Sequence, residues 1–189
     1  MRLQNYICVT ALVLATCCVS LSAQTFQNLS SVSGTLNQGL FSTNLAWGDY
    51  DGDGFLDLYC TNWGTAVTNP INALYQNQGD ETFINAAAIA GVDNNGNSMS
   101  AAFADYDNDG DLDLVSASPT DDTVAWYEND GAANPTLAAA DIATNADGAN
   151  SVFLVDLDSD GDIDILSSSY NDDTIAWYEN NGAADPTFA

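Results

Sequence analysis

Short apolar runs alternate with clusters of glycine, asparagine and aspartate along most of this chain. The runs are rich in β-branched and aromatic side chains, which favour strands, and the clusters between them are typical of turns. No stretch shows sustained helical periodicity. The nearest candidates, residues 86–90 and 138–140, lie within runs that we expect to be strands. The pattern therefore predicts an all-β protein.

The pattern repeats with a period of about 51 residues. Residues 121–129 (DDTVAWYEN) return as residues 172–180 (DDTIAWYEN). Three units, approximately 41–92, 97–144 and 149–189, each divide into four predicted strands. Four short antiparallel strands in a unit of about 50 residues are typical of a β-propeller blade. The chain is therefore expected to hold about three blades.

The predicted strands occupy equivalent places in the three units. First strands are expected at 45–47, 101–103 and 152–154, second strands at 58–60, 114–116 and 165–167, third strands at 73–75, 125–127 and 176–178, and fourth strands at 82–92 and 136–144. Residues 25–34 resemble residues 82–91. They therefore predict a lone fourth strand, the offset that a propeller uses to close its ring.

Three blades are too few for an ordinary ring, which has about four to eight. The sequence ends at residues 187–189, where a fourth strand should begin. We interpret the chain as a fragment of a larger ring with exposed blade edges. Assembly of several copies is the alternative if the chain is complete.

One nine-residue motif, D-x-D-x-D-G-x-[LI]-D, occurs once in each unit, between the first and second strands. We call residues 49–57 loop 1, residues 105–113 loop 2 and residues 156–164 loop 3. Carboxylates at positions 1, 3 and 5 crowd together unless a cation lies among them, and oxygen ligands in flexible loops favour Ca²⁺. The glycine at position 6 permits a sharp turn. We expect about three Ca²⁺ ions, one in each loop.

Position 7 of each loop can add a backbone carbonyl, position 8 anchors the loop to the core, and position 9 adds another carboxylate. The predicted ligands are Asp49, Asp51, Asp53, Phe55 and Asp57 in loop 1, Asp105, Asp107, Asp109, Asp111 and Asp113 in loop 2, and Asp156, Asp158, Asp160, Asp162 and Asp164 in loop 3.

Two other interpretations of the motif are weaker. An EF-hand needs a glutamate at position 12 and flanking helices, whereas position 12 here is Cys60, Ser116 or Ser167 and the flanks are strand-like. A solvated acidic turn explains one copy of the motif. It does not explain three copies with matched glycines and matched aspartates at position 9.

The charge balance supports bound cations. Arg2 is the only basic residue, there are 27 acidic residues, and the net charge is −26. The three loops contain 14 of the acidic residues. Because like charges at this density disfavour a compact state, bound cations supply the available counter-charge. Nucleic acid and anionic membranes are disfavoured as partners.

Residues 1–23 have the character of a secretory signal peptide. An apolar run follows Arg2, and small residues precede a cleavage site expected after Ser22 or Ala23. The run is too short to span a membrane, and no other stretch is long enough. A lipoprotein signal ending at Cys17 is the weaker alternative. We expect a secreted, extracellular or cell-surface protein, with a periplasmic location also possible. Cys60 alone remains after cleavage, which excludes an intrachain disulfide framework.

Residues 46–58, followed by residues 74–79 and 82–83, resemble the FG-GAP/VCBS repeat. This family includes the integrin α-subunit propeller and many secreted bacterial proteins. The resemblance covers about residues 25–189, and we interpret residues 24–189 as a partial propeller of this type. It implies a β-propeller, usually seven-bladed, with Ca²⁺ held by Asp49, Asp51, Asp53 and Asp57 and by their counterparts in loops 2 and 3. The FG-GAP tripeptides themselves are absent.

We expect a secreted calcium-binding module that mediates protein or carbohydrate binding or adhesion, in which Ca²⁺ has a structural role. The alternative is the propeller part of a polysaccharide-active enzyme. The mature chain offers no His, Lys or Arg for acid–base or oxyanion chemistry, and its only glutamates are Glu81, Glu128 and Glu179. We therefore predict no catalytic residue.

A third alternative is sugar binding by the repeated aromatic residues Trp126, Tyr127, Trp177 and Tyr178. Their positions on repeated strands favour a core role instead. The partner is otherwise expected to be an unidentified extracellular protein or glycan.

Overall fold

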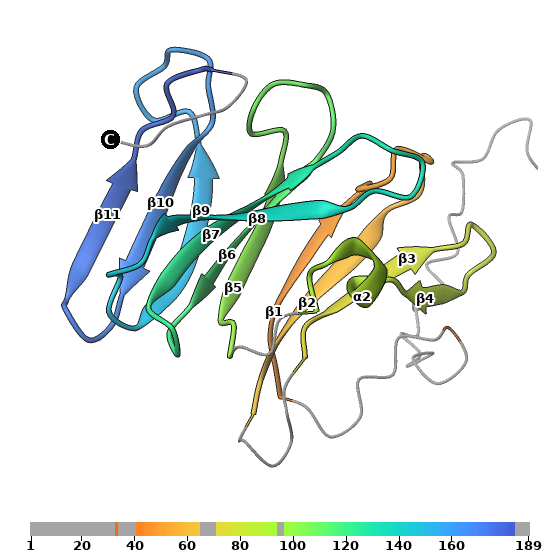
Figure 1. Cartoon of the computed structure of the whole chain (residues 1–189), viewed down its shortest axis with the longest axis horizontal. Helices are drawn as coiled ribbons and strands as arrows, with labels where there is room; N and C mark the ends of the chain where they lie inside the picture. Colours follow the sequence, from red (N-terminus) through yellow and green to blue (C-terminus); the bar gives the residue numbers. More distant parts are fainter. Residues whose placement is uncertain (1–32, 34–40, 65–70, 94–96, 184–189) are drawn as a thin grey trace, which may run out of the picture.

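The computed structural model describes residue 33 and residues 41–64, 71–93 and 97–183. The predicted signal peptide, almost all of the predicted lone strand at 25–34 and the chain end after residue 183 lie outside these ranges. The described residues form three antiparallel sheets (Figure 1), which confirms the all-β prediction. No helix in the described ranges is both long and apolar enough to cross a membrane.

Each sheet lies within one predicted unit and has the strand order of a propeller blade, with consecutive strands paired. Blade 1 consists of β1 (Phe41–Gly48), β2 (Asp57–Trp63), β3 (Ala73–Asn77) and β4 (Phe83–Asn85); blade 2 of β5 (Ser100–Ala104), β6 (Asp113–Ser118), β7 (Thr123–Asn129) and β8 (Leu137–Ala143); and blade 3 of β9 (Ala149–Val155), β10 (Asp164–Ser169) and β11 (Thr174–Tyr178). A fourth strand of blade 3 would lie outside the described residues.

The first two strands of every blade pair in the same register. Leu45 lies opposite Cys60 in blade 1, Ala101 opposite Ser116 in blade 2, and Val152 opposite Ser167 in blade 3. Because side chains alternate between the two faces of a strand, this shared register places equivalent side chains on equivalent faces. The three hairpins are therefore structural repeats as well as sequence repeats.

The strand expected at residues 82–92 is partly wrong. The strand β4 ends at Asn85, and α2 (Ala87–Ala90) follows it. Alanine has the highest helix propensity, and the Asn85 Oδ1 accepts a hydrogen bond from the Ala87 N–H at 3.1 Å, which supports the first turn. Gly91 ends the helix at φ 79°, a conformation that glycine adopts without strain. The counterpart in blade 2 is the strand β8, as expected.

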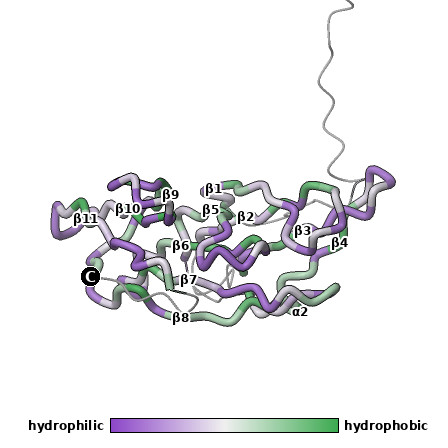
Figure 2. Tube along the Cα trace, turned by 90° about the horizontal axis from the view of Figure 1, so that it is seen from above, coloured by the Kyte–Doolittle hydropathy of each residue, from purple (hydrophilic) through white to green (hydrophobic). Residues whose placement is uncertain are grey.

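The three sheets stand side by side, and the innermost strand of each blade lies next to that of its neighbour. Figure 2 shows β1, β5 and β9 along one side of the molecule and β8 and α2 along the opposite side. The Asn44 Oδ1 on β1 accepts a hydrogen bond from the Ala101 N–H on β5 at 3.2 Å. The Ser100 Oγ on β5 accepts one from the Val152 N–H on β9 at 3.3 Å.

The apolar cores lie between the blades. The core between blades 1 and 2 contains Ala46, Tyr50, Tyr59, Leu74, Ala87, Ala90, Val92, Ala101, Leu114, Ala125, Tyr127 and Leu137. The core between blades 2 and 3 contains Tyr106, Val115, Ala117, Val124, Trp126, Ala143, Ala146, Ala149, Val152 and Ile165. A blade therefore buries its faces mainly against its neighbours.

The sheets bury Cys60 and two of the repeated aromatic residues. Cys60 is a buried thiol on β2, as a small strand residue should be. Trp126 and Tyr127 are also buried, so neither offers a stacking face to a sugar.

Candidate metal centre

Each acidic loop joins the two innermost strands of its blade. Loops 1, 2 and 3 follow β1, β5 and β9 and end at the first residue of β2, β6 and β10. The glycine at position 6 has a φ of 91°, 101° and 103° at Gly54, Gly110 and Gly161. Side chains other than glycine rarely adopt such values, so the motif glycine is required by the turn.

The aspartate at position 9 anchors its loop with both carboxylate oxygens. The Tyr50 N–H donates to the Asp57 Oδ2 at 3.0 Å, and the Asn77 N–H donates to the Asp57 Oδ1 at 2.8 Å. The same two bonds recur on Asp113 from Tyr106 (3.0 Å) and Asn129 (2.8 Å), and on Asp164 from Leu157 (3.1 Å) and Asn180 (2.8 Å). All three carboxylates are buried. This residue therefore ties the loop to the third strand of the same blade.

Burial makes the loops electrostatically costly. It raises the pKa of Asp57 and of Asp113 to about 6, against the opposing effect of the two backbone N–H donors on each. Burial also raises the pKa of Tyr50 to about 12, and the carboxylates of Asp51, Asp57 and Asp53 add to that rise. The loops are therefore regions of negative potential that lack a neutralising charge.

The carboxylates at positions 3 and 5 are oriented by the backbone of their own loop. The Asp51 Oδ1 accepts from the Asp53 N–H at 3.2 Å, and the Asp53 Oδ1 accepts from the Phe55 N–H at 2.8 Å. Equivalent bonds join Asp109 to Asp107 (3.2 Å), Asp111 to Asp109 (2.9 Å), Asp160 to Asp158 (3.2 Å) and Asp162 to Asp160 (3.0 Å). Such local bonds orient the side chains from within the loop. In loop 1 the Gln76 Nε2 on β3 also donates to the Asp51 Oδ2.

The aspartate at position 1 has a buried oxygen without a hydrogen-bond donor. The Gly54 N–H donates to the Asp49 Oδ2 at 2.9 Å, and the Gly161 N–H donates to the Asp156 Oδ2 at 3.2 Å. The Oδ1 atoms of Asp49, Asp105 and Asp156 are buried and accept no hydrogen bond. Leaving such a group unpaired is costly. Its recurrence at one position of all three loops fits a cation that carboxylate oxygens would bind, and Ca²⁺ has this preference.

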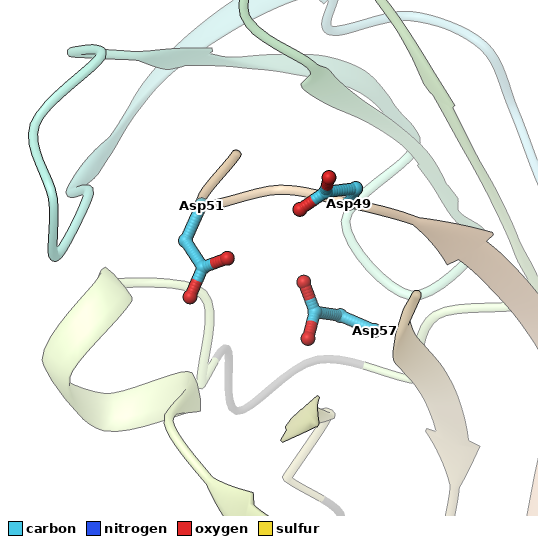
Figure 3. A group of neighbouring side chains, drawn as sticks. All are labelled: Asp49, Asp51 and Asp57. Carbon is cyan, nitrogen blue, oxygen red and sulfur yellow. The ribbon is translucent and has the colours of Figure 1, made fainter. Parts of the chain in front are cut away.

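The structure brings three carboxylates together in every loop. The groups are Asp49, Asp51 and Asp57 in loop 1, Asp105, Asp107 and Asp109 in loop 2, and Asp156, Asp158 and Asp160 in loop 3, each with oxygen atoms within 4.8 Å of one another. Figure 3 shows the loop 1 carboxyl groups facing a common space. At that separation two carboxylates repel by roughly 3 kcal/mol at an effective dielectric of about 20. A divalent cation would turn this repulsion into attraction.

The remaining predicted ligands lie less close to these groups. Asp53 is exposed and is replaced by Asp57 in the loop 1 group, whereas Asp113 and Asp164 are outside the groups of their loops. Two of the position 7 side chains, Asp111 and Asp162, lie against Gly131 and Gly182, where a Cβ atom would collide with them. Ligation by the position 7 carbonyls of Phe55, Asp111 and Asp162 stays a prediction.

Sequence reasoning missed a recurring asparagine. Asn77, Asn129 and Asn180 belong to a Tyr-x-Asn-x-Gly pattern that recurs in all three units. Their Nδ2 atoms donate to the carbonyls of Leu56, Leu112 and Ile163, at position 8 of their own loops, at 3.0, 2.9 and 3.1 Å. Their Oδ1 atoms accept from the N–H groups of Gly79, Gly131 and Gly182, each at 3.0 Å. The recurrence was visible in the sequence, but its role was not.

Two of these asparagines also reach the preceding blade. The Asn129 Nδ2 donates to the Tyr50 carbonyl in loop 1 at 2.8 Å, and the Asn180 Nδ2 donates to the Tyr106 carbonyl in loop 2 at 2.8 Å. Tyr50 and Tyr106 stand at position 2, beside the aspartates with the unpaired oxygens. Each of these loops is therefore tied to its own blade and to the next.

Two similarities to known proteins accompany this geometry. A profile of the family described as FG-GAP-like repeat matches residues 49–116 and, overlapping them, residues 105–167. Human cartilage acidic protein 1 is 42% identical over 60 residues, which are 31% of this chain and 8% of that relative. The chain therefore spans only a small part of the relative's length.

Proposed function

The chain belongs to the FG-GAP-like repeat family, and on that premise we propose that it is an extracellular, calcium-stabilised repeat module for binding or adhesion. The observation that carries the calcium assignment is the buried, unpaired Oδ1 atom at position 1 of all three loops. The acidic groups around these atoms, at Asp49, Asp105 and Asp156, supply further carboxylate oxygens.

The role proposed for the ion is structural. Ca²⁺ would be held by the carboxylates at positions 1 and 3, together with Asp57 in loop 1, Asp109 in loop 2 and Asp160 in loop 3. When bound it supplies positive charge to a site that lacks it. The loop backbone orients the side chains, and the Asn129 and Asn180 amides join two loops to the next blade. Calcium would therefore stabilise the contact between blades as well as the hairpin.

The extracellular location is part of the proposal. Free Ca²⁺ is abundant outside cells, and weak sites of extracellular modules have dissociation constants of about 10⁻⁴ to 10⁻³ M. The relative is named for cartilage and for its acidity, and this chain has a net charge of −26. These features fit a protein that works where calcium is plentiful.

A shallow cleft offers a place for a ligand at the ends of the strands opposite the acidic loops. Its volume is about 240 Å³, and its lining residues are Trp63, Met99, Pro119, Gly148, Asn150, Tyr170 and Asn171. Trp63 is the last residue of β2, and Tyr170 directly follows β10. Both rings are exposed. Exposed aromatic faces beside amide groups favour an uncharged sugar, because the blades carry no basic side chain to bind an anion.

A chelator melt tests the calcium assignment. Binding at ten to a hundred times the dissociation constant stabilises a protein by about 1.4 to 2.7 kcal/mol per site, or about 4 to 8 kcal/mol for three sites. Excess EGTA should therefore lower the melting temperature by many degrees, and added Ca²⁺ should restore it, with Mg²⁺ as the control ion. An unchanged melting temperature would exclude a stabilising role for calcium.

A glycan array tests the ligand. Binding should be lost in Tyr170→Ala and retained in Tyr178→Phe, a change at an aromatic residue that packs against the core between blades 2 and 3. If both variants still bind the glycan, the cleft is excluded as the binding site. An array without any bound glycan would favour a protein ligand.

A further inference from the structure

The residue before each recurring asparagine differs between the blades. It is Gln76 in blade 1, Glu128 in blade 2 and Glu179 in blade 3. The tyrosine that precedes it on the third strand pairs with the second residue of the neighbouring strand, which is Leu58, Leu114 or Ile165. Because a shared register places side chains at equivalent positions, the blades present either an amide or a carboxylate at one point beside the acidic loop.

In blade 1 this side chain reaches the loop. The Gln76 Nε2 donates a hydrogen bond to the Asp51 Oδ2, at position 3 of loop 1. The Asp51 Oδ1 accepts another from the Asp53 N–H at 3.2 Å. Both carboxylate oxygens of Asp51 therefore have a donor, and the neutral amide leaves the charge of the loop unchanged.

In blade 2 the equivalent side chain is acidic. An ionised carboxylate only accepts hydrogen bonds, so Glu128 cannot repeat the bond seen in blade 1. Burial raises the pKa of Asp107, at position 3 of loop 2. The negative charges of Asp109, Glu128 and Asp105 add to that rise. Glu128 is therefore near enough to the loop to repel its carboxylates when no cation lies between them.

The three loops consequently differ in the charge that they gather. Loop 1 has four carboxylates beside a neutral Gln76, whereas loops 2 and 3 have five each and gain a sixth from Glu128 or Glu179. In calcium-binding loops the number of charged ligands tunes the dissociation constant over several orders of magnitude. Loop 1 is therefore expected to bind calcium less tightly than the other two.

We propose that Glu128 and Glu179 are calcium ligands of loops 2 and 3, supplied from outside the nine-residue motif, and that loop 1 is the weakest of the three sites. The side chain that orients Asp51 in blade 1 thus contributes charge to the ion in blades 2 and 3. It also links the ion to the third strand of the blade. The inference rests on the calcium function proposed above and adds residues that the loop motif does not contain.

Exchanging the amide and the carboxylate between blades tests the proposal. Calorimetric titration of the wild-type chain with Ca²⁺ should resolve two tighter sites and one weaker site. Glu128→Gln should weaken one of the tighter sites by about tenfold or more, and Gln76→Glu should strengthen the weaker site by a similar factor. Glu179→Gln should repeat the first result at loop 3. Asp141→Asn removes one charge from an exposed position on β8, in the same sheet as Glu128, and should leave all the sites unchanged.

A shorter acid separates direct ligation from a general effect of charge. Glu128→Asp keeps the negative charge but withdraws the carboxylate by one methylene group. A ligand loses affinity on this change, whereas a charge that acts from a distance does not, so Glu128→Asp should also weaken loop 2. Glu128 is exposed, and near-ultraviolet circular dichroism of its variants without calcium should therefore match the wild type.

The outcomes distinguish this proposal from the calcium function on which it rests. Three sites of equal affinity, or a Glu128→Gln variant that keeps both tighter sites, would overturn the proposal and leave calcium binding itself intact. A Glu128→Asp variant that binds as tightly as the wild type would overturn direct ligation. A wild-type chain that takes up no calcium would overturn both.

Discussion

Blades 2 and 3 carry almost the same sequence on their third strands, yet the two strands lie in different environments. Residues 123–129 of β7 are largely buried, whereas residues 174–178 of β11 are largely exposed. The loops of the two blades differ little, because the same aspartates accept the same backbone hydrogen bonds in loops 2 and 3. Loop geometry is therefore local to a blade, while burial of an aromatic face depends on a neighbouring blade.

The largest expected difference is between two equivalent tryptophans. Trp126→Ala should destabilise the protein by about 3 to 5 kcal/mol, because it leaves a cavity in the core between blades 2 and 3. Trp177→Ala should cost less than about 1.5 kcal/mol, because Trp177 is partly exposed. Urea denaturation of both variants measures the difference. Equal costs would show that the face of blade 3 is covered in solution.

A second pair of variants separates the local from the cross-blade part of the asparagine network. Asn129→Ala removes the amide that holds the Leu112 carbonyl and the Tyr50 carbonyl of the preceding blade. It should cost about 2 to 3 kcal/mol, since buried acceptors are left unpaired. Asn77→Ala removes the local bond to the Leu56 carbonyl and should cost about 1 kcal/mol. The same denaturation experiment compares them, and equal losses would argue against a tie between blades.

A separate effect is the pH dependence of the calcium-free protein. Burial raises the pKa of Asp57 and Asp113 to about 6 in the folded state, above the ordinary value of 3.8. A carboxyl group with a raised pKa stabilises the fold fully below its unfolded pKa, and that contribution is lost as the pH rises through the folded pKa. In EGTA the melting temperature should therefore fall between about pH 4 and pH 7. A melting temperature that rises across this window would contradict the raised pKa values.

Much of the fold could be read from the sequence because the repeat is strict. The period, the strands flanking each acidic loop and the all-β class follow from alternating apolar positions and turn residues. The strand predicted over residues 82–92 was partly wrong, since high helix propensity and the Asn85 side chain override the repeat over Ala87–Ala90. The exposure of Ile175 could not be predicted from its own segment, because Val124 in the same local sequence is buried.

The sequence predicted which residues form the candidate site but not the different roles of the aspartates within it. The motif indicates that carboxylates converge, but it does not tell which oxygen is already engaged. In the structure both carboxylate oxygens of the aspartate at position 9 accept hydrogen bonds from backbone N–H groups, whereas the aspartate at position 1 has one buried oxygen without a donor. That distinction depends on contacts with Asn77 and its equivalents, which lie on or just after the third strand of the blade, outside the motif itself.

A calorimetric titration with Ca²⁺ tests the central claim most directly. The loops are built alike, so the wild-type chain should bind about three ions, and Asp105→Asn, which removes the carboxylate with the unpaired oxygen from loop 2, should reduce the number by one. Asp121→Asn changes an exposed aspartate outside the loops and should leave the number unchanged. A wild-type chain that takes up no calcium, or an Asp105→Asn variant that binds as many ions as the wild type, would contradict the account.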